Sequence, residues 1–285
     1  MPYINVGQEN SGKINLYYED HGTGKPVVLV HGWPLSVRSW EKQVPALLDA
    51  GHRVITYDRR GFGDSSRPTS GYDYDTFAQD LHKLVTELDL RDIALVGFSM
   101  GGGEVARYLG RYGTERVSKA VFISSIPPYL LKTRDNPDGV ASDVFEGIKK
   151  EIAADRPAFL SKFLSDFYNV DTLGKSLISP EAVQLSWNIA AGASPVGTLE
   201  CVSAWLTDFR EELKNIRVPT LVIHGDADRI LPISATGRRT AELVKGSKLA
   251  VVQGGPHGIT WTHAAKVNQE LLSFLGQSVR SAHAA

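Results

Sequence analysis

The sequence predicts an α/β fold in which an eight-stranded, mostly parallel sheet carries helices on both faces and a helical cap follows the sixth strand. Two observations support this prediction. Strand-like apolar runs alternate with amphipathic helical stretches over the first 125 residues. From about residue 139 to residue 213 the chain shows helical patterns only, after which strand-like runs resume. A series of strands that resumes after one helical block favours a single sheet with an inserted cap over an unrelated helical domain.

Seven segments have the composition of strands. Residues 14–20 follow the pattern of an edge strand, whereas 26–30 is a continuous apolar run that is typical of a buried parallel strand. The full set is 14–20, 26–30, 54–57, 93–96, 120–123, 220–223 and 248–252. Amphipathic stretches that we expect to be helical lie near 37–49, 74–89, 100–112 and 262–275. This alternation predicts βαβ units, and therefore a mostly parallel sheet.

The helical block is expected to contain four helices, over 144–152, 159–167, 181–190 and 199–213. The predicted domain organisation follows from these helices. Residues 1–130 and 214–285 form the α/β core, and residues 131–213 form the helical cap.

Charge and composition argue against several classes of partner. The 285 residues include 31 Lys and Arg against 32 Asp and Glu, so the net charge of −1 does not suggest nucleic acid or an anionic membrane. Cys201 is the only cysteine, which excludes an intrachain disulfide and fits a reducing compartment. The N-terminus lacks the pattern of a signal peptide, and no apolar run approaches the roughly 20 residues that span a bilayer. We therefore expect a cytoplasmic protein.

The pentapeptide 97–101, Gly-Phe-Ser-Met-Gly, carries the strongest chemical signal. It follows the strand-like run 92–96 and precedes a helical stripe of apolar side chains, as a strand–turn–helix elbow requires. Such a turn pushes the serine hydroxyl out of the sheet, and only very small residues fit two positions away on either side. Gly97 and Gly101 hold those positions. We therefore predict that Ser99 is a nucleophile at a helix N-terminus, where N–H groups stabilise an anionic intermediate.

A serine needs a base to take its proton and an acid to orient that base, and in this topology the chain order is serine, acid, histidine. Four of the eight histidines follow Ser99. His283 lies in a tail of small residues, His224 ends a buried strand and is expected to be structural, and His263 is expected to be a surface or capping residue. His257 stands in a glycine- and proline-containing loop just past the last predicted strand, and we predict that it is the base.

Two aspartates follow the strand 220–223 and are candidates for the acid. Asp226 comes directly after the strand end, where a short side chain often binds backbone amides in a turn. Asp228 lies further along the loop and has more reach toward His257. We predict that Asp228 is the acid and that Asp226 forms the turn.

The oxyanion hole needs two backbone N–H donors. One is the amide of Met100, which follows the nucleophile. The other is expected from Trp33 in the loop after the strand 26–30, because Gly32 lets the backbone approach closely and Pro34 restricts the conformation of Trp33. A second dense segment, 58–65, contains two arginines that could bind an anion, but we interpret it as a structural turn.

The pocket walls are less well defined by the sequence. Phe159 and Phe163 lie four residues apart on one expected cap helix, where they either face the active site or pack the cap on the core. Ile230, two residues beyond the predicted acid, and Leu130, after the sixth strand, are further candidates for substrate-binding residues.

Together these motifs resemble the cofactor-free bacterial haloperoxidases of the α/β-hydrolase fold, also described as non-haem chloroperoxidases, aryl esterases and, in close relatives, γ-lactamases. The resemblance runs from Tyr3 to about Leu275 and rests on segments at 31–34, 58–63, 97–101, 224–228 and 255–258. It implies the triad Ser99, Asp228 and His257, with no metal, haem or other cofactor. It further implies small-molecule ester or lactam substrates, a homo-oligomer, and acyl transfer either to water or to hydrogen peroxide, whose peracid product oxidises halide. Pro34 resembles the members in which perhydrolysis is efficient.

Two alternatives stay open at this point. The same triad could hydrolyse an amide or lactam, or the fold could bind a ligand without catalysis. Haloalkane dehalogenases and epoxide hydrolases share the architecture but place aspartate at the elbow, so Ser99 argues against both.

Overall fold

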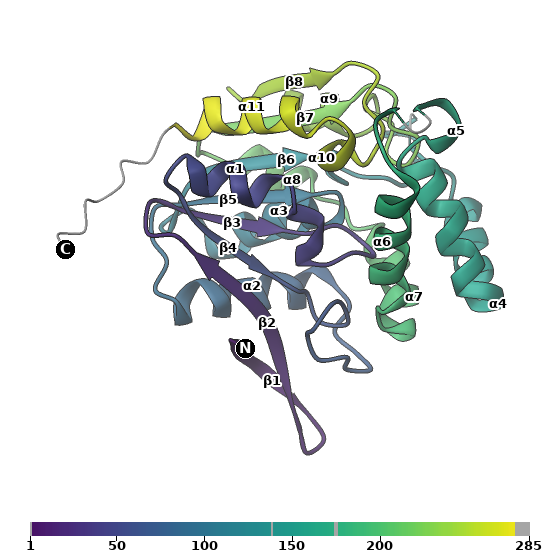
Figure 1. The fold of residues 1–285 in the computed structure, drawn as a ribbon, viewed down its shortest axis with the longest axis horizontal. Coiled ribbons are helices and arrows are strands. Elements are labelled where there is room, and N and C mark those ends of the chain that lie inside the picture. The colour runs from purple at the N-terminus through teal and green to yellow at the C-terminus, as the bar shows by residue number, and fades with distance from the viewer. Residues whose placement is uncertain (1, 138, 174–175, 277–285) are drawn as a thin grey trace.

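The computed structural model describes residues 2–137, 139–173 and 176–276, and His283 lies outside these ranges. Its centre is a single eight-stranded sheet in the order β1-β2-β4-β3-β5-β6-β7-β8 (Figure 1). The strands are β1 (Tyr3–Glu9), β2 (Gly12–His21), β3 (Pro26–Val30), β4 (Arg53–Tyr57), β5 (Ile93–Phe98), β6 (Val117–Ile123), β7 (Thr220–Gly225) and β8 (Lys248–Val252). The predicted fold class, a mostly parallel eight-stranded sheet with helices on both faces, is confirmed.

Strand direction separates an edge hairpin from the central sheet. β1 pairs antiparallel with β2, and β2 pairs antiparallel with β4, whereas every neighbouring pair from β4 to β8 is parallel. β5 is buried along its whole length, which explains its continuous apolar sequence. β1 has no such signal, because only Ile4 and Val6 of its seven residues are buried. The sequence pattern therefore did not locate this strand.

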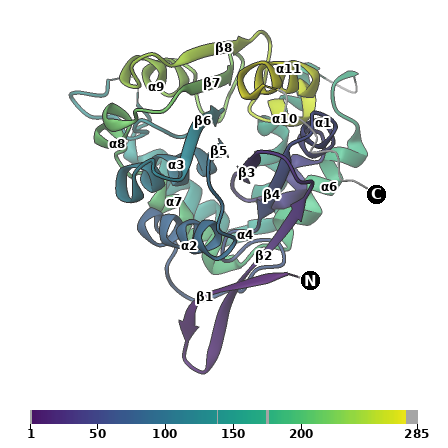
Figure 2. The same cartoon turned by 90° about the vertical axis from the view of Figure 1, so that its left-hand side faces the viewer.

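Helices cover both faces of the sheet. Figure 2 shows α1 (Gln43–Asp49) and α11 (Ala264–Leu275) on one face. The opposite face carries a second group of four helices, which are α2 (Tyr74–Glu87), α3 (Met100–Tyr112), α8 (Arg210–Asn215) and α9 (Gly237–Leu243). A 3-10 turn, η1 (Val37–Trp40), precedes α1, and the short α10 (Ile259–Thr262) precedes α11. The stretch expected at 37–49 is thus two elements, whereas the helix expected at 262–275 is α11, with α10 as a separate short helix before it.

The cap helices between β6 and β7 gather beyond one end of the sheet (Figure 1). They are α4 (Ser142–Phe167), α5 (Val170–Leu173), α6 (Pro180–Ala191) and α7 (Pro195–Ala204). α4 is broken at Asp155, whose φ of −155° and ψ of 84° are not helical, and Pro157 follows in the next turn. The side chain of Asp155 accepts a hydrogen bond from Ala158 N at 3.0 Å, so a new helical turn begins there. The two helices expected at 144–152 and 159–167 are the two halves of α4.

The single helix expected over 199–213 is wrong. The structure has two helices there, because α7 ends at Ala204 and α8 begins only at Arg210. The carboxylate of Asp208 accepts a hydrogen bond from Arg210 N at 3.0 Å, which favours a new start at this position. No helix in the described part of the chain has both the length and the apolar character that crossing a membrane requires.

Candidate active site

Ser99 stands at a sharp turn between β5 and α3. Its φ of 54° and ψ of −120° lie in a region that residues with a side chain rarely adopt. A Cβ at Gly97 would lie 2.5 Å from the carbonyl oxygen of Gly101, and one at Gly101 would collide with the backbone of Val30. Only glycine fits at either place. The strained elbow that the sequence predicts is therefore present. The close approach of the Gly101 backbone explains Gly97, and the packing of β3 against the elbow explains Gly101.

Three of the predicted site residues meet beyond the carboxyl ends of the strands. Ser99 Oγ lies 2.8 Å from His257 Nε2, and His257 Nδ1 lies 2.7 Å from Asp228 Oδ2. His257 is fully buried, and the rings of Phe98 and Phe167 pack against its imidazole with centroids 5.3 and 4.8 Å away. Because the carboxylate accepts from Nδ1–H, Nε2 is left free to accept the proton of the serine hydroxyl.

Asp228 is held by four hydrogen-bond donors. Its Oδ1 accepts from the backbone N–H groups of Ile230 and Leu231 at 2.9 and 2.8 Å. Its Oδ2 faces His257 Nδ1 at 2.7 Å and His224 Nε2 at 3.2 Å. Burial by itself raises the pKa of Asp228, but the charge of His257 and the hydrogen bonds from both imidazoles outweigh it. The pKa therefore lies well below its usual range, and the group stays a carboxylate.

The other candidates for acid and base lie elsewhere. Asp226 is exposed and accepts a hydrogen bond from Gly254 N at 2.7 Å, so it joins two loops. His263 bonds to the hydroxyl of its neighbour Thr262 at 2.9 Å. His224 is buried as expected, but its contact with the Asp228 carboxylate was missed, because a strand residue facing a loop residue leaves no periodic signal.

The loop after β3 lies directly over the elbow. The His31 ring fixes it, since Nδ1 lies 2.8 Å from the carbonyl of Gly32 and Nε2 accepts from Arg59 N at 3.0 Å. Burial and the nearby Arg59 guanidinium hold the pKa of His31 well below its ordinary value, so the ring is neutral. Trp33, the predicted second oxyanion donor, follows in this loop and joins Pro34 through a cis peptide bond.

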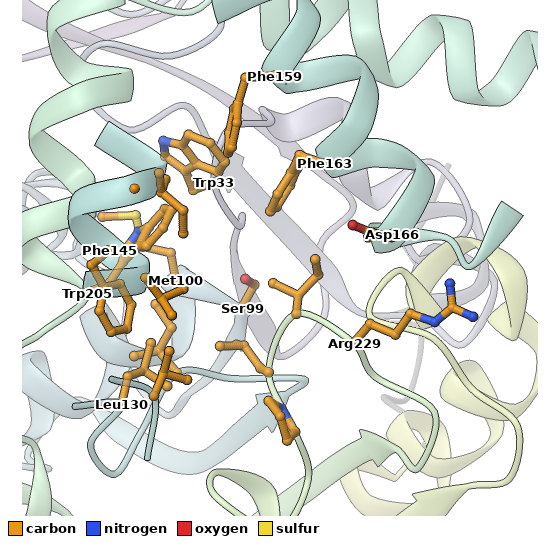
Figure 3. A pocket seen from close by; sticks show the side chains of 18 of the residues that line it. Trp33, Ser99, Met100, Leu130, Phe145, Phe159, Phe163, Asp166, Trp205 and Arg229 are labelled. Carbon is orange, nitrogen blue, oxygen red and sulfur yellow. The ribbon is translucent and has the colours of Figure 1, made fainter. Parts of the chain in front are cut away.

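A cavity of about 510 Å³ opens at Ser99 (Figure 3). Trp33 and Met100 line it, as do the four predicted wall residues Leu130, Phe159, Phe163 and Ile230. The sequence reasoning missed the remaining wall residues, which are Ile126, Val140, Val144, Phe145, Gly147, Ile148, Glu151, Lys162, Asp166, Trp205, Arg229, Leu231 and Pro232. In the view of Figure 3, Phe145, Trp205 and Leu130 lie to one side of Ser99, and Asp166 and Arg229 lie to the other.

Aromatic side chains from the cap and the core form a cluster in the wall of this cavity. The indole of Trp33 packs edge-on against Phe163 and Trp205 with centroids 5.0 and 4.9 Å apart, and against Phe159 at 6.3 Å. Trp33 Nε1 also donates to the carbonyl of Thr198 on α7 at 3.2 Å. The sequence left open whether Phe159 and Phe163 face the site or pack the cap on the core. They do both, because they line the cavity and contact Trp33 of the core.

The arginines of segment 58–65 each pair with a buried carboxylate. Arg59 Nε lies 2.7 Å from Glu104 Oε2, and both side chains are almost fully buried. Arg60 Nε lies 2.7 Å from Asp80 Oδ2, also buried. Asp58 accepts hydrogen bonds from Val37 N and Asp64 N, both at 2.8 Å, and burial raises its pKa to about 6. These contacts agree with a structural turn.

Comparison with known proteins places this geometry in a family. A model of the alpha/beta hydrolase fold matches residues 25–264. The chain belongs to the α/β-hydrolase family. It is 63% identical over 275 residues, or 96% of this chain and 100% of the other, to a Synechocystis sp. protein provisionally named a non-heme chloroperoxidase.

Two further relatives of this α/β hydrolase bear on its chemistry. A bromoperoxidase from Bacillus anthracis has a crystal structure that matches with a TM-score of 0.93 and 52% identity, over 96% of this chain and 99% of that one. A bifunctional esterase/perhydrolase from Acinetobacter calcoaceticus is 38% identical over 267 residues, or 92% of this chain and 96% of that protein. The resemblance to the haloperoxidase group that the motifs predict is confirmed.

Proposed function

We propose that this α/β hydrolase is a serine carboxylester hydrolase with perhydrolase activity on small acyl or aryl esters. The observation that carries the proposal is the chain of hydrogen bonds from Ser99 through His257 to Asp228, set at the base of a largely apolar cavity. The names of its relatives, which include an esterase/perhydrolase, support the same chemistry.

Acylation begins at the serine. His257 Nε2 takes the hydroxyl proton while Ser99 Oγ forms a bond to the ester carbonyl carbon. The backbone N–H groups of Met100 and Trp33 donate to the resulting oxyanion, and the Asp228 carboxylate stabilises the imidazolium. The intermediate collapses when the C–O bond to the alcohol breaks and His257 returns its proton to the departing oxygen. The acyl group then remains on Ser99.

Deacylation uses the same base. His257 removes a proton from water, whose oxygen attacks the acyl carbon. The bond from the acyl carbon to Ser99 Oγ then breaks as His257 returns the proton to that oxygen, and the products are the carboxylic acid and free Ser99. Hydrogen peroxide can attack in place of water, and the product is then a peracid. The peracid oxidises a halide ion in solution to hypohalous acid and is itself reduced to the carboxylic acid. Halide oxidation thus follows from acyl transfer and needs no halide site.

The test is a paired assay on the purified protein. Hydrolysis of p-nitrophenyl acetate measures the esterase reaction. Bromination of a phenol in acetate buffer with hydrogen peroxide and bromide measures the perhydrolase reaction. Ser99→Ala should lower both by a factor of roughly 10⁴ or more. Bromination that persists unchanged in Ser99→Ala would mean that peracid is not made at this serine.

We also propose a homo-oligomer in a reducing, cytoplasmic location, on the basis of the family resemblance and the single cysteine. Light scattering tests the oligomeric state, since a mass of one 31.1 kDa chain would contradict a homo-oligomer. Fractionation of the producing cells tests the location.

A further inference from the structure

His224 contacts the proposed acid from inside the sheet. It is the fifth residue of β7 and is fully buried. Its Nε2 lies 2.9 Å from the carbonyl oxygen of Leu231 and 3.2 Å from Asp228 Oδ2. Both neighbours are acceptors, so Nε2 carries a hydrogen and shares it between them.

The other face of this imidazole fixes its charge state. His224 Nδ1 is buried and has no hydrogen-bond partner among the described residues. Gly237 packs so closely on this ring that a Cβ added there would lie 2.7 Å from Nδ1. A proton on Nδ1 would be buried without an acceptor, which is costly, so the ring is neutral with its hydrogen on Nε2.

The Asp228 carboxylate is thus saturated with donors. Its Oδ1 faces two backbone amides, and its Oδ2 lies between two imidazoles. A hydrogen bond from His224 withdraws part of the negative charge that Oδ2 would otherwise present to His257. It also prevents the carboxylate from rotating about its Cβ–Cγ bond.

We propose that His224 is a positioning residue for the catalytic pair, which acts by holding Asp228 Oδ2 toward His257 and by moderating the charge that His257 meets. This inference rests on the proposed function of the Ser99 site. A merely structural histidine at this place would tie the loop 228–231 to β7 without altering how His257 titrates.

Few other titratable groups lie near His257 and Asp228, so few could set the pH dependence of turnover. Phe98 and Phe167 pack on the His257 ring. Two charged side chains lie near Asp228 on its loop, and both are exposed. Asp226 accepts a hydrogen bond from Gly254 N, and Arg229 pairs with Asp171 at 2.7 Å. His263, which lies between α10 and α11, bonds to the hydroxyl of Thr262. Asp228 is the titratable group in direct contact with His257, and His224 contacts Asp228 in turn.

The experiment compares His224→Met, which keeps the length but removes the donor, with His224→Gln, which keeps an N–H donor. The matched control is His52→Met. His52 is also buried, lies 2.9 Å through Nε2 from a carbonyl oxygen, that of Gly276, and also has an unpartnered Nδ1, but it precedes β4 at the other end of the sheet.

The two quantities to measure are p-nitrophenyl acetate turnover and the rate at which a fluorophosphonate labels Ser99, both from pH 5 to 9. His224→Met should lower kcat and the labelling rate about tenfold with KM unchanged, and should move the acid limb upward by about half a pH unit. His224→Gln should restore most of both. His52→Met should lower the melting temperature and leave both pH profiles unchanged.

A folded His224→Met protein with a wild-type pH profile and labelling rate would overturn the inference. The two readouts keep this result distinct from failure of the proposed function, since wild-type protein that is labelled but does not cleave esters would contradict only the latter. Proton NMR of the hydrogen between His257 Nδ1 and Asp228 gives a third readout that needs no reaction. Its resonance should move in His224→Met and stay in place in His52→Met.

Discussion

Gly32 lies directly against Ser99. A Cβ added to Gly32 would stand 2.9 Å from Ser99 Cβ and 3.1 Å from the ring of Phe98. The loop after β3 therefore approaches the elbow as closely as a backbone can, and it does so one residue before Trp33. This contact brings the loop of Trp33, the predicted oxyanion donor, close to Ser99.

Gly32→Ala should reduce kcat because the new methyl group pushes the loop, and the Trp33 amide with it, away from the developing oxyanion. The expected loss is roughly 10- to 100-fold in p-nitrophenyl acetate turnover, with KM little changed. Gly7→Ala is the control, since its Cβ would meet only Ile14 Cδ1 at 3.9 Å and should leave kcat unchanged. Equal rates for the two variants would show that the loop can yield without loss.

Asp228→Asn should change the pH dependence of stability. The folded-state pKa of Asp228 lies below its unfolded value of 3.8, so its stabilisation is present above that pH and disappears as pH falls below it. The wild-type protein should therefore be more stable than Asp228→Asn at pH 7, and the difference should shrink below about pH 4. Urea unfolding at a series of pH values measures it. Asp226→Asn, which removes an exposed carboxylate of the same loop, controls for the substitution itself.

Glu104→Gln should destabilise the fold. The buried Glu104 carboxylate pairs with Arg59 and also accepts a hydrogen bond from Tyr57, so its neutralisation leaves a buried guanidinium without its counter-ion. The expected loss is about 3–5 kcal/mol in the free energy of unfolding, measured in denaturant. Glu146→Gln removes a surface pair with Lys149 and should cost about 1 kcal/mol or less. Similar losses in both variants would contradict this account.

Phe145→Ala should widen the acyl preference. Phe145 lines the cavity from the first half of α4 and is 4% exposed, so its removal enlarges the space beside Ser99. Relative kcat/KM in a series of p-nitrophenyl esters should rise for longer chains, at a cost of about 3 kcal/mol in stability. Phe274→Ala on α11, which packs on the core and does not line the cavity, should leave the preference unchanged. An unchanged preference in Phe145→Ala would mean that the acyl chain lies elsewhere.

Local motifs explain how much of the site could be predicted. The elbow at Ser99 is defined by residues within a pentapeptide and by the strand and helix beside it. Because all of these residues are neighbours in the sequence, the pattern alone predicts the turn. Asp228 and His257 each follow a strand that the sequence predicts, and parallel strands bring their carboxyl ends to one edge of the sheet. The fold class followed in the same way from continuous apolar strands. The strand β1 was not predicted, because a half-exposed edge strand has almost no apolar signal.

The sequence by itself determined the parallel part of the sheet, the inserted helices and the candidate residues Ser99, Asp228 and His257, because these depend on short-range sterics and on patterns of burial along the chain. Only the tertiary structure decided what lies against them. Phe145 and Trp205 enter the cavity, and His224 reaches Asp228, through packing between elements far apart in sequence. Periodicity shows which face of an element is apolar or buried, but the partner of that face is set by side chains that meet only when the chain has folded.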